Sequence, residues 1–167
     1  LMSTDMGETW DERTAGLLLP YVRTVYRVRH QGASLIAATE AGGVFRSDDA
    51  GVSWSEHRLP DTIATVTDVL LTGRWMFAAT GSGLFRTSSD GGPWERLSDG
   101  IAATNWTSLA SDGGKLFAAS LTEGIFVSTD EGITWLQENE GLLWHKILSL
   151  AVGGSYLYAG TEGGGVY

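Results

Sequence analysis

An eight-residue motif recurs four times along this chain of 167 residues. Its copies end at Trp10, Trp54, Trp94 and Trp135, which are 44, 40 and 41 positions apart. A period near 40 residues constrains the fold strongly, because one unit of this length cannot bury its own faces and must stack on its neighbours. The chain is therefore predicted to be a repeat protein.

Three further motifs keep the same period, and each has the length and composition of a short β-strand. The first is an apolar run at 25–29, 66–70, 106–110 and 147–151. The second is a run of small residues at 35–39, 76–80, 116–120 and 157–161, and the third is a Gly-apolar-aromatic triplet at 43–45, 83–85, 124–126 and 165–167. Four short strands per unit, separated by glycine-rich turns, predict an all-β array, since apolar residues nowhere keep helical spacing for long.

The radial way to stack such units is a β-propeller built of four-stranded antiparallel blades. The sequence divides into four units, which cover residues 2–45, 46–85, 86–126 and 127–167. We expect a single propeller, or a segment of one, with four blades in this chain.

The composition excludes several functional classes. The chain has no cysteine, which excludes disulfides, thiolate metal sites and cysteine nucleophiles. Its formal net charge is -9, so binding to nucleic-acid phosphates is not expected. Its apolar runs are far shorter than the roughly 20 residues of a membrane-spanning helix.

The recurring motif resembles the Asp-box of the BNR-repeat propellers, in the sialidase-like superfamily. Two copies match fully, the second copy has Ser53 in place of threonine, and the third is degenerate, with Ser89 and Pro93 at the aspartate and threonine positions. We therefore expect the third turn to be less tightly hydrogen-bonded. The residues that carry the resemblance are Ser3, Asp5, Gly7, Thr9, Trp10, Ser47, Asp49, Gly51, Trp54, Gly91, Trp94, Ser128, Asp130, Gly132, Thr134 and Trp135.

The resemblance implies that these residues are structural. An aspartate can accept hydrogen bonds from backbone N–H groups of its own turn, glycine can adopt a backbone conformation costly for other residues, and tryptophan can anchor the hairpin by burial. One aspartate per blade does not converge on a point, so no metal site and no cofactor are expected. The nearest resemblance is to the photosystem II stability and assembly factors, and the family favours an extracellular or periplasmic location.

A catalytic site finds little support in the sequence. Arg23, Arg27 and Arg29 alternate along one predicted strand, so they form either an anion clamp or a solvated strand face. The histidines His30, His57 and His145 have no nucleophile motif near them, and we interpret them as turn or surface residues.

A ligand, if there is one, is expected on the loops that lead into the first strand of each unit, because these loops differ most among the repeats. Their aromatic and polar side chains form the candidate binding residues. These are Tyr21, Arg23, Asn105, Trp106, Trp144, His145 and Lys146. The alternative is that Trp106 and Trp144 fill the mouth of the channel or a gap between blades.

The sequence is compatible with three arrangements of the blades. The spacing from Trp135 through Tyr167 and back to Trp10 is in step with the repeat, which suits a closed ring of four blades or a ring of eight made by two chains. A propeller segment with missing blades is the third alternative, and we favour a segment or a multi-chain ring over a closed monomer.

The sequence thus predicts a non-enzymatic interaction module that binds a protein or a glycan. The alternative is part of a sialidase-like or xyloglucanase-like glycoside hydrolase whose catalytic residues lie outside this chain. The partners expected are a protein or glycan ligand and either a second copy or further blades.

Overall fold

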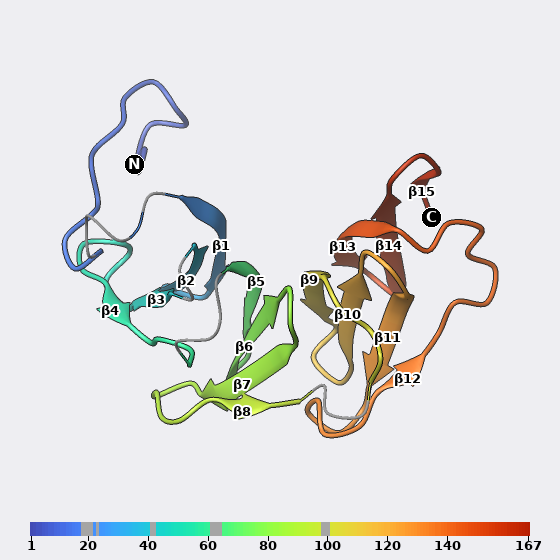
Figure 1. Cartoon of the computed structure of the whole chain (residues 1–167). Helices are drawn as coiled ribbons and strands as arrows, with labels where there is room; N and C mark the ends of the chain where they lie inside the picture. The colour runs from blue at the N-terminus through green and yellow to red at the C-terminus, as the bar shows by residue number, and fades with distance from the viewer. Residues whose placement is uncertain (18–21, 23, 41–42, 61–64, 98–100) are drawn as a thin grey trace.

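Four antiparallel sheets make up the computed structural model, which describes residues 1–17, 22, 24–40, 43–60, 65–97 and 101–167 (Figure 1). We number the sheets as blades 1 to 4 in chain order. Blade 1 contains β1 (Val25–Gln31), β2 (Ser34–Thr39), β3 (Val44–Ser47) and β4 (Ser55–Glu56). Blade 2 contains β5 (Val66–Leu71), β6 (Trp75–Thr80), β7 (Leu84–Ser88) and β8 (Glu95–Arg96). Blade 3 contains β9 (Trp106–Ser111), β10 (Leu116–Ser120), β11 (Gly124–Ser128) and β12 (Leu136–Gln137), and blade 4 contains β13 (Ile147–Gly153), β14 (Tyr156–Thr161) and β15 (Gly165–Val166).

The blades follow one another around an arc, with the first strand of each sheet on the inside (Figure 1). The inner strand β1 packs against β5, β5 against β9, and β9 against β13. The predicted all-β propeller of four blades is confirmed. Each sheet begins at its inner strand, so the sheets are out of phase with the sequence units, which end within or just after a third strand.

Apolar cores fill the spaces between successive blades. The small residues of the second strands are buried there, including Ala38, Ala79 and Ala119. Larger side chains complete the cores, with Ile36 and Met76 between blades 1 and 2, Phe77 and Trp106 between blades 2 and 3, and Ile125 and Ile147 between blades 3 and 4. Burial between neighbours, rather than within one sheet, therefore holds the arc together.

The Asp-box turns close by hydrogen bonds among their own side chains and backbone. In the fourth copy, the Asp130 carboxylate accepts the Thr134 N–H at 2.8 Å and the Ser128 hydroxyl at 2.8 Å. The Ser128 hydroxyl oxygen in turn accepts the Gly132 N–H at 2.8 Å. The copies around Asp5 and Asp49 repeat these bonds. In each of these three copies, a non-glycine residue with a positive φ angle precedes a glycine with a positive φ angle. Glycine adopts this left-handed backbone conformation at little cost, which explains why it recurs at this position.

The third copy lacks this network, as the sequence predicts. Thr87 occupies the position of the first serine, and its buried hydroxyl has no hydrogen-bond partner. The turn is held instead by the Gly91 N–H, which donates to the Ser88 carbonyl at 2.9 Å. Replacing the aspartate by Ser89 therefore removed the acceptor that organises the other three turns.

Two of the Asp-box tryptophans anchor their turns on the preceding segment, and Trp135 donates instead to the Gly132 carbonyl of its own turn at 2.9 Å. The indole N–H of Trp94 donates to the His57 carbonyl at 3.2 Å, and that of Trp54 donates to the Arg13 carbonyl at 3.1 Å. Trp10 is exposed instead. The described part of the chain has no helix with the length and apolar character that a membrane span requires.

Candidate functional site

Four of the candidate binding residues belong to one rim of the arc, at the ends of the strands opposite the Asp-boxes. These are Asn105, Trp144, His145 and Lys146. Backbone hydrogen bonds define this rim, because the residue before an inner strand accepts an N–H from the turn between the second and third strands. Glu40 donates to Thr24 at 3.2 Å, Leu121 to Asn105 at 3.0 Å, and Glu162 to Lys146 at 2.9 Å. These three bonds place the residues before β1, β9 and β13 on the same rim, and residues 61–64 of the blade 2 loop lie outside the described residues.

Trp144, His145 and Lys146 lie together on this rim in front of β13. The Trp144 ring is 49% exposed and packs against Gly163 and Gly164. A Cβ atom at Gly164 would come within 2.3 Å of the ring, so a residue without a side chain is needed there. Lys146 Nζ is paired with a Glu162 carboxylate oxygen at 3.3 Å, and His145 is exposed beside it. The result is an exposed aromatic surface with donors and an acceptor at its edge.

Asn105 occupies the position in blade 3 that Lys146 occupies in blade 4, directly before the inner strand. Its N–H donates to the carbonyl of Gly81 at 2.9 Å, in the turn of blade 2, and its φ of 54° places it in the left-handed region. The backbone of Asn105 thus joins two blades. Its side chain lies 3.8 Å from the position that a Cβ on Gly81 would take.

Trp106 lies in the interior instead. Its ring is fully buried and packs edge-on against Phe126, with 5.1 Å between the ring centroids. The indole nitrogen is buried without a hydrogen-bond partner. Trp106 therefore fills the core between blades 2 and 3 and presents no face to a ligand in this structure. Tyr21 and Arg23 lie outside the described residues.

The arginines of β1 hold an anion that belongs to the chain itself. Arg29 grips the fully buried carboxylate of Asp68 with two bonds, from Nη2 at 2.7 Å and from Nε at 3.2 Å. Arg27 Nε lies 3.4 Å from the same carboxylate. Arg29 also donates to the Leu109 carbonyl at 3.2 Å. Arg27 and Arg29 thus bind a structural carboxylate of the same chain, and Arg23, the third arginine of the predicted row, lies outside the described residues.

Asp68 continues the network into the other blades. Its carboxylate accepts the Ser108 hydroxyl at 3.0 Å and the Leu109 N–H at 2.9 Å, both from β9. The Ser108 hydroxyl oxygen accepts the Leu150 N–H from β13 at 3.1 Å. Sequence reasoning missed Asp68, although a signal exists: the third residue of each inner strand is polar, as Arg27, Asp68, Ser108 and Ser149 show.

His57 takes a structural place between blades 1 and 2. Its ring lies beside the Ser55 hydroxyl, with 3.3 Å between Oγ and Nε2, and its carbonyl holds Trp94. Burial lowers the pKa of His57, and the nearby charge of Arg46 lowers it further. His57 is therefore uncharged near pH 7.

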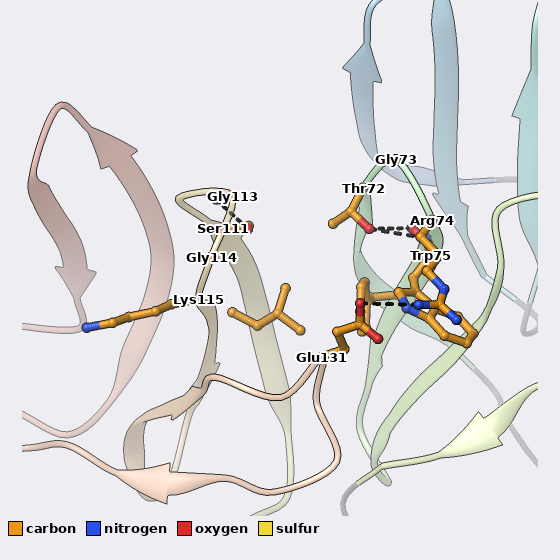
Figure 2. Close-up of a pocket in the computed structure, with 11 residues that line it drawn as sticks. Thr72, Gly73, Arg74, Trp75, Ser111, Gly113, Gly114, Lys115 and Glu131 are labelled. Carbon is orange, nitrogen blue, oxygen red and sulfur yellow. Dashed lines mark hydrogen bonds and ion pairs between the residues drawn. The ribbon is translucent and has the colours of Figure 1, made fainter.

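A groove on the Asp-box side, between blades 2 and 3, was not predicted (Figure 2). It has a volume of about 210 Å³ and lies between the β5–β6 turn and the β9–β10 turn, with Glu131 at its edge. The guanidinium carbons of Arg74 and Arg86 lie 5.2 and 4.4 Å from the Trp75 ring centroid. Arg74 is also paired with Glu131 at 3.9 Å, and Figure 2 shows Lys115 extending away from Trp75. The charges at this groove are thus largely engaged with one another.

The described residues hold no group of three or more His, Cys, Asp or Glu side chains that could bind a metal ion. Neither the rim nor the groove brings together a nucleophile, a general base and an orienting partner from the described residues. What the rim exposes is one aromatic ring and the polar groups around it.

No family model and no curated protein matches this sequence. Solved structures do match the fold. The computationally designed Ika4 protein has a TM-score of 0.73 at 12% identity, covering 95% of this chain and 97% of Ika4. YCF48 from Cyanidioschyzon merolae has a TM-score of 0.65 at 18% identity, covering 97% of this chain and 56% of YCF48. The GH74 enzyme of Niastella koreensis has a TM-score of 0.68 at 14% identity, covering 84% of this chain and 26% of the enzyme.

These likenesses define the class of protein as a β-propeller. The chain is similar in fold to propellers of the BNR type, which include YCF48 and GH74 enzymes. It spans nearly all of Ika4, about half of YCF48 and about a quarter of the GH74 enzyme.

Proposed function

We propose that this chain is a non-enzymatic binding module of the Asp-box type, whose rim recognises a protein or a glycan. The observation that carries the proposal is Trp144, a half-exposed ring that packs against Gly163 and Gly164 beside Lys146 and Glu162. A rigid aromatic surface is desolvated easily and loses little entropy on binding. The fold likeness to YCF48, at 18% identity, supports the propeller frame of this proposal. The Asp-box family resemblance favours an extracellular or periplasmic location within the proposal.

Backbone hydrogen bonds along the rim give the proposal its frame. Backbone bonds fix the segments before β9 and β13 against their neighbouring turns, so side chains on them are positioned before a ligand arrives. Preorganisation of this kind lowers the entropic cost of binding. We place Trp144, His145 and Lys146 in direct contact with the ligand and Asn105 at the edge of the site, one blade away.

The test is a binding screen with two libraries, a glycan array and displayed random peptides, each read with the wild-type chain and with Trp144→Ala. The matched control is Trp10→Ala, which removes an exposed tryptophan from the Asp-box side. Selective binding that Trp144→Ala abolishes and Trp10→Ala leaves intact supports the proposal, and the library that gives it identifies the ligand class. Binding that depends on Trp10 instead places the site on the wrong side of the arc and refutes it.

A second candidate is part of a glycoside hydrolase, which the fold likeness to GH74 enzymes favours. In that case the catalytic carboxylates lie outside this chain, and the rim supplies substrate contacts only. A binding assay with xyloglucan or a sialylated oligosaccharide separates the two candidates. Binding of either glycan without turnover favours the second candidate, and selective binding of a peptide favours the first. Turnover by the chain itself would contradict both descriptions, because both place no catalytic residues in it.

A further inference from the structure

The first end of the arc exposes apolar side chains that the repeat buries elsewhere. Val25 and Val28 of β1 are 44% and 53% exposed. Their counterparts at the same register in β5, Val66 and Val69, are fully buried in the core between blades 1 and 2. The face of blade 1 that carries Val25 and Val28 therefore has the composition of a blade-to-blade contact.

The opposite end exposes the complementary face. Val166 of β15 is 74% exposed, whereas its counterpart in blade 3, Ile125, is 4% exposed. Tyr158 of β14 is 46% exposed, whereas its counterpart in blade 2, Phe77, is 3% exposed. No packing comparable to that between neighbouring inner strands joins β13 to β1 among the described residues.

Blade 4 has three strands, and the N-terminal segment has the form of the part that it lacks. Met2 and Asp11 exchange two backbone hydrogen bonds of 2.8 Å, which is the pairing that Arg46 and Ser55 make between β3 and β4 of blade 1. The segment after this hairpin is held by Trp54, whose N–H donates to the Ala15 carbonyl at 2.9 Å. Residues 1–17 are thus already placed as the outer edge of a blade that precedes blade 1.

The complete blades fix the register in which such an edge docks. In each of them, the residue three positions after the Asp-box tryptophan donates its N–H to the second residue of the Gly-apolar-aromatic triplet. These bonds are His57 to Val44 at 2.7 Å, Leu97 to Leu84 at 2.8 Å and Glu138 to Ile125 at 2.9 Å. The corresponding donor and acceptor at the two ends are the N–H of Arg13 and the carbonyl of Val166, which lie at opposite ends of the arc (Figure 1).

We propose that a second copy of this chain covers both ends, so that two arcs close a ring of eight blades. The N-terminal hairpin of each copy adds the fourth strand to blade 4 of the other, with the Arg13 N–H donating to the Val166 carbonyl. Glu12 then lies opposite Tyr167 of the partner, as Glu56 lies opposite Phe45 in blade 1. Leu1, which lies beyond the Met2–Asp11 pair in the same hairpin, leaves this position to Tyr167. This mode of association is strand addition at a sheet edge, in which main-chain bonds set the register.

The polar network of the inner strands continues across the same junction. Asp68 accepts the N–H of Leu109 from the next blade, and Ser108 accepts that of Leu150 from the blade after it. Ser149 is the next residue in this series, and it is exposed in the single arc. In the two-copy ring its hydroxyl accepts the N–H of Val28 from the partner.

Two arrangements compete with the two-copy ring. Further blades of a longer chain could cover the same two faces, and a folded monomer of residues 1–167 would favour them. The other is a ring within residues 1–167, and the network argues against it. Asp68 and its partners tie β1, β5, β9 and β13 into one body with fixed angles between blades. Bringing Arg13 to Val166 of the same chain would require these contacts and the three interblade cores to change. A second copy satisfies both ends without altering the arc.

The first experiment measures absolute mass by light scattering on the chain of residues 1–167 and on two variants. The expected mass is twice the 17.9 kDa of one chain. Val28→Glu places a charge in the junction, so dimerisation should weaken by about tenfold or more. Val52→Glu is the matched control, because Val52 is 50% exposed on an Asp-box turn away from the junction. It should remain a dimer.

The second experiment tests the register by disulfide formation, for which the chain offers no cysteine of its own. Mixing a Glu12→Cys chain with a Tyr167→Cys chain should give a covalent dimer under mild oxidation. Glu8→Cys mixed with Tyr167→Cys is the control and should not cross-link, because Glu8 lies in the exposed turn of the hairpin.

Each outcome decides the proposal. A dimer that Val28→Glu dissociates, together with the Glu12–Tyr167 cross-link, supports it. A folded monomer at all concentrations overturns it, and so does a cross-linked monomer from the double variant Glu12→Cys/Tyr167→Cys, which would show closure within one chain. Open-ended higher oligomers overturn it as well, because they would show that the junction forms without ring closure.

Discussion

Arg29 and Asp68 form a two-bond ion pair that joins the inner strands of blades 1 and 2. Arg29 Nη2 and Nε lie 2.7 and 3.2 Å from the two carboxylate oxygens. The carboxylate is fully buried, and the guanidinium keeps part of its surface in water. Because Asp68 also accepts bonds from β9, one side chain organises three of the four blades.

Replacing Asp68 should therefore destabilise the whole arc. Asp68→Asn keeps the shape but removes the charge that Arg27 and Arg29 neutralise. We expect a loss of about 2–3 kcal/mol in the free energy of unfolding, below the upper range for buried pairs because both arginines stay partly exposed. Urea unfolding followed by circular dichroism measures it. Asp90→Asn, on an exposed turn, is the control and should change stability by less than about 0.5 kcal/mol. Equal effects from the two variants would contradict a special role for Asp68.

Much of the fold could be predicted because the same strand pattern and turn motif recur in each unit. Four copies of the same strand pattern and of the turn around residues such as Asp130 predicted the blades, and the degenerate turn at Ser89 behaved as expected. The site was harder to predict because contacts between blades are not periodic. Nothing local in the sequence distinguishes Trp106, which is buried, from Trp144, which is exposed, and the partner of Arg29 lies 39 positions away.

The Asp-box carboxylates should make the protein sensitive to acid. Hydrogen bonds from Ser53 and Ser47 lower the pKa of Asp49 to about 2, and those from Thr134 and Ser128 lower the pKa of Asp130 to about 2. A carboxyl whose pKa is lower in the folded state stabilises the protein fully above its ordinary value of 3.8, and this contribution is lost as pH falls toward 2.

The measurement is the thermal midpoint between pH 5 and pH 2 for the wild type and for Asp130→Asn. The wild type should lose stability steeply below pH 4. The variant should start lower and fall less, because one of the linked groups is gone. Parallel curves for the two proteins would show that Asp130 is not among the groups responsible.

Restoring the degenerate third turn should stabilise blade 2. Ser89→Asp with Pro93→Thr recreates the full motif and gives the buried hydroxyl of Thr87 an acceptor, which it lacks at present. We expect a gain of about 1 kcal/mol in the free energy of unfolding. Ser88→Asp adds the same charge at a position that is not the acceptor in the other turns, and it should give no gain. A gain from both variants would point to charge rather than to the turn.

Trp106 and Trp144 should differ in how much they contribute to stability, because one lies in the core and the other on the rim. Trp106→Ala empties a fully buried position between blades 2 and 3, and it should cost about 3–5 kcal/mol in the free energy of unfolding. Trp144→Ala removes a ring that is half in water, so the cost should be about 1 kcal/mol or less. Chemical denaturation of both variants gives the comparison.

Because Trp144 lies on the rim and contributes little to stability, any binding that Trp144→Ala abolishes would report on contact with a ligand rather than on unfolding. A large stability loss in Trp144→Ala would instead make this residue part of the frame, and the rim would have to bind through His145 and Lys146.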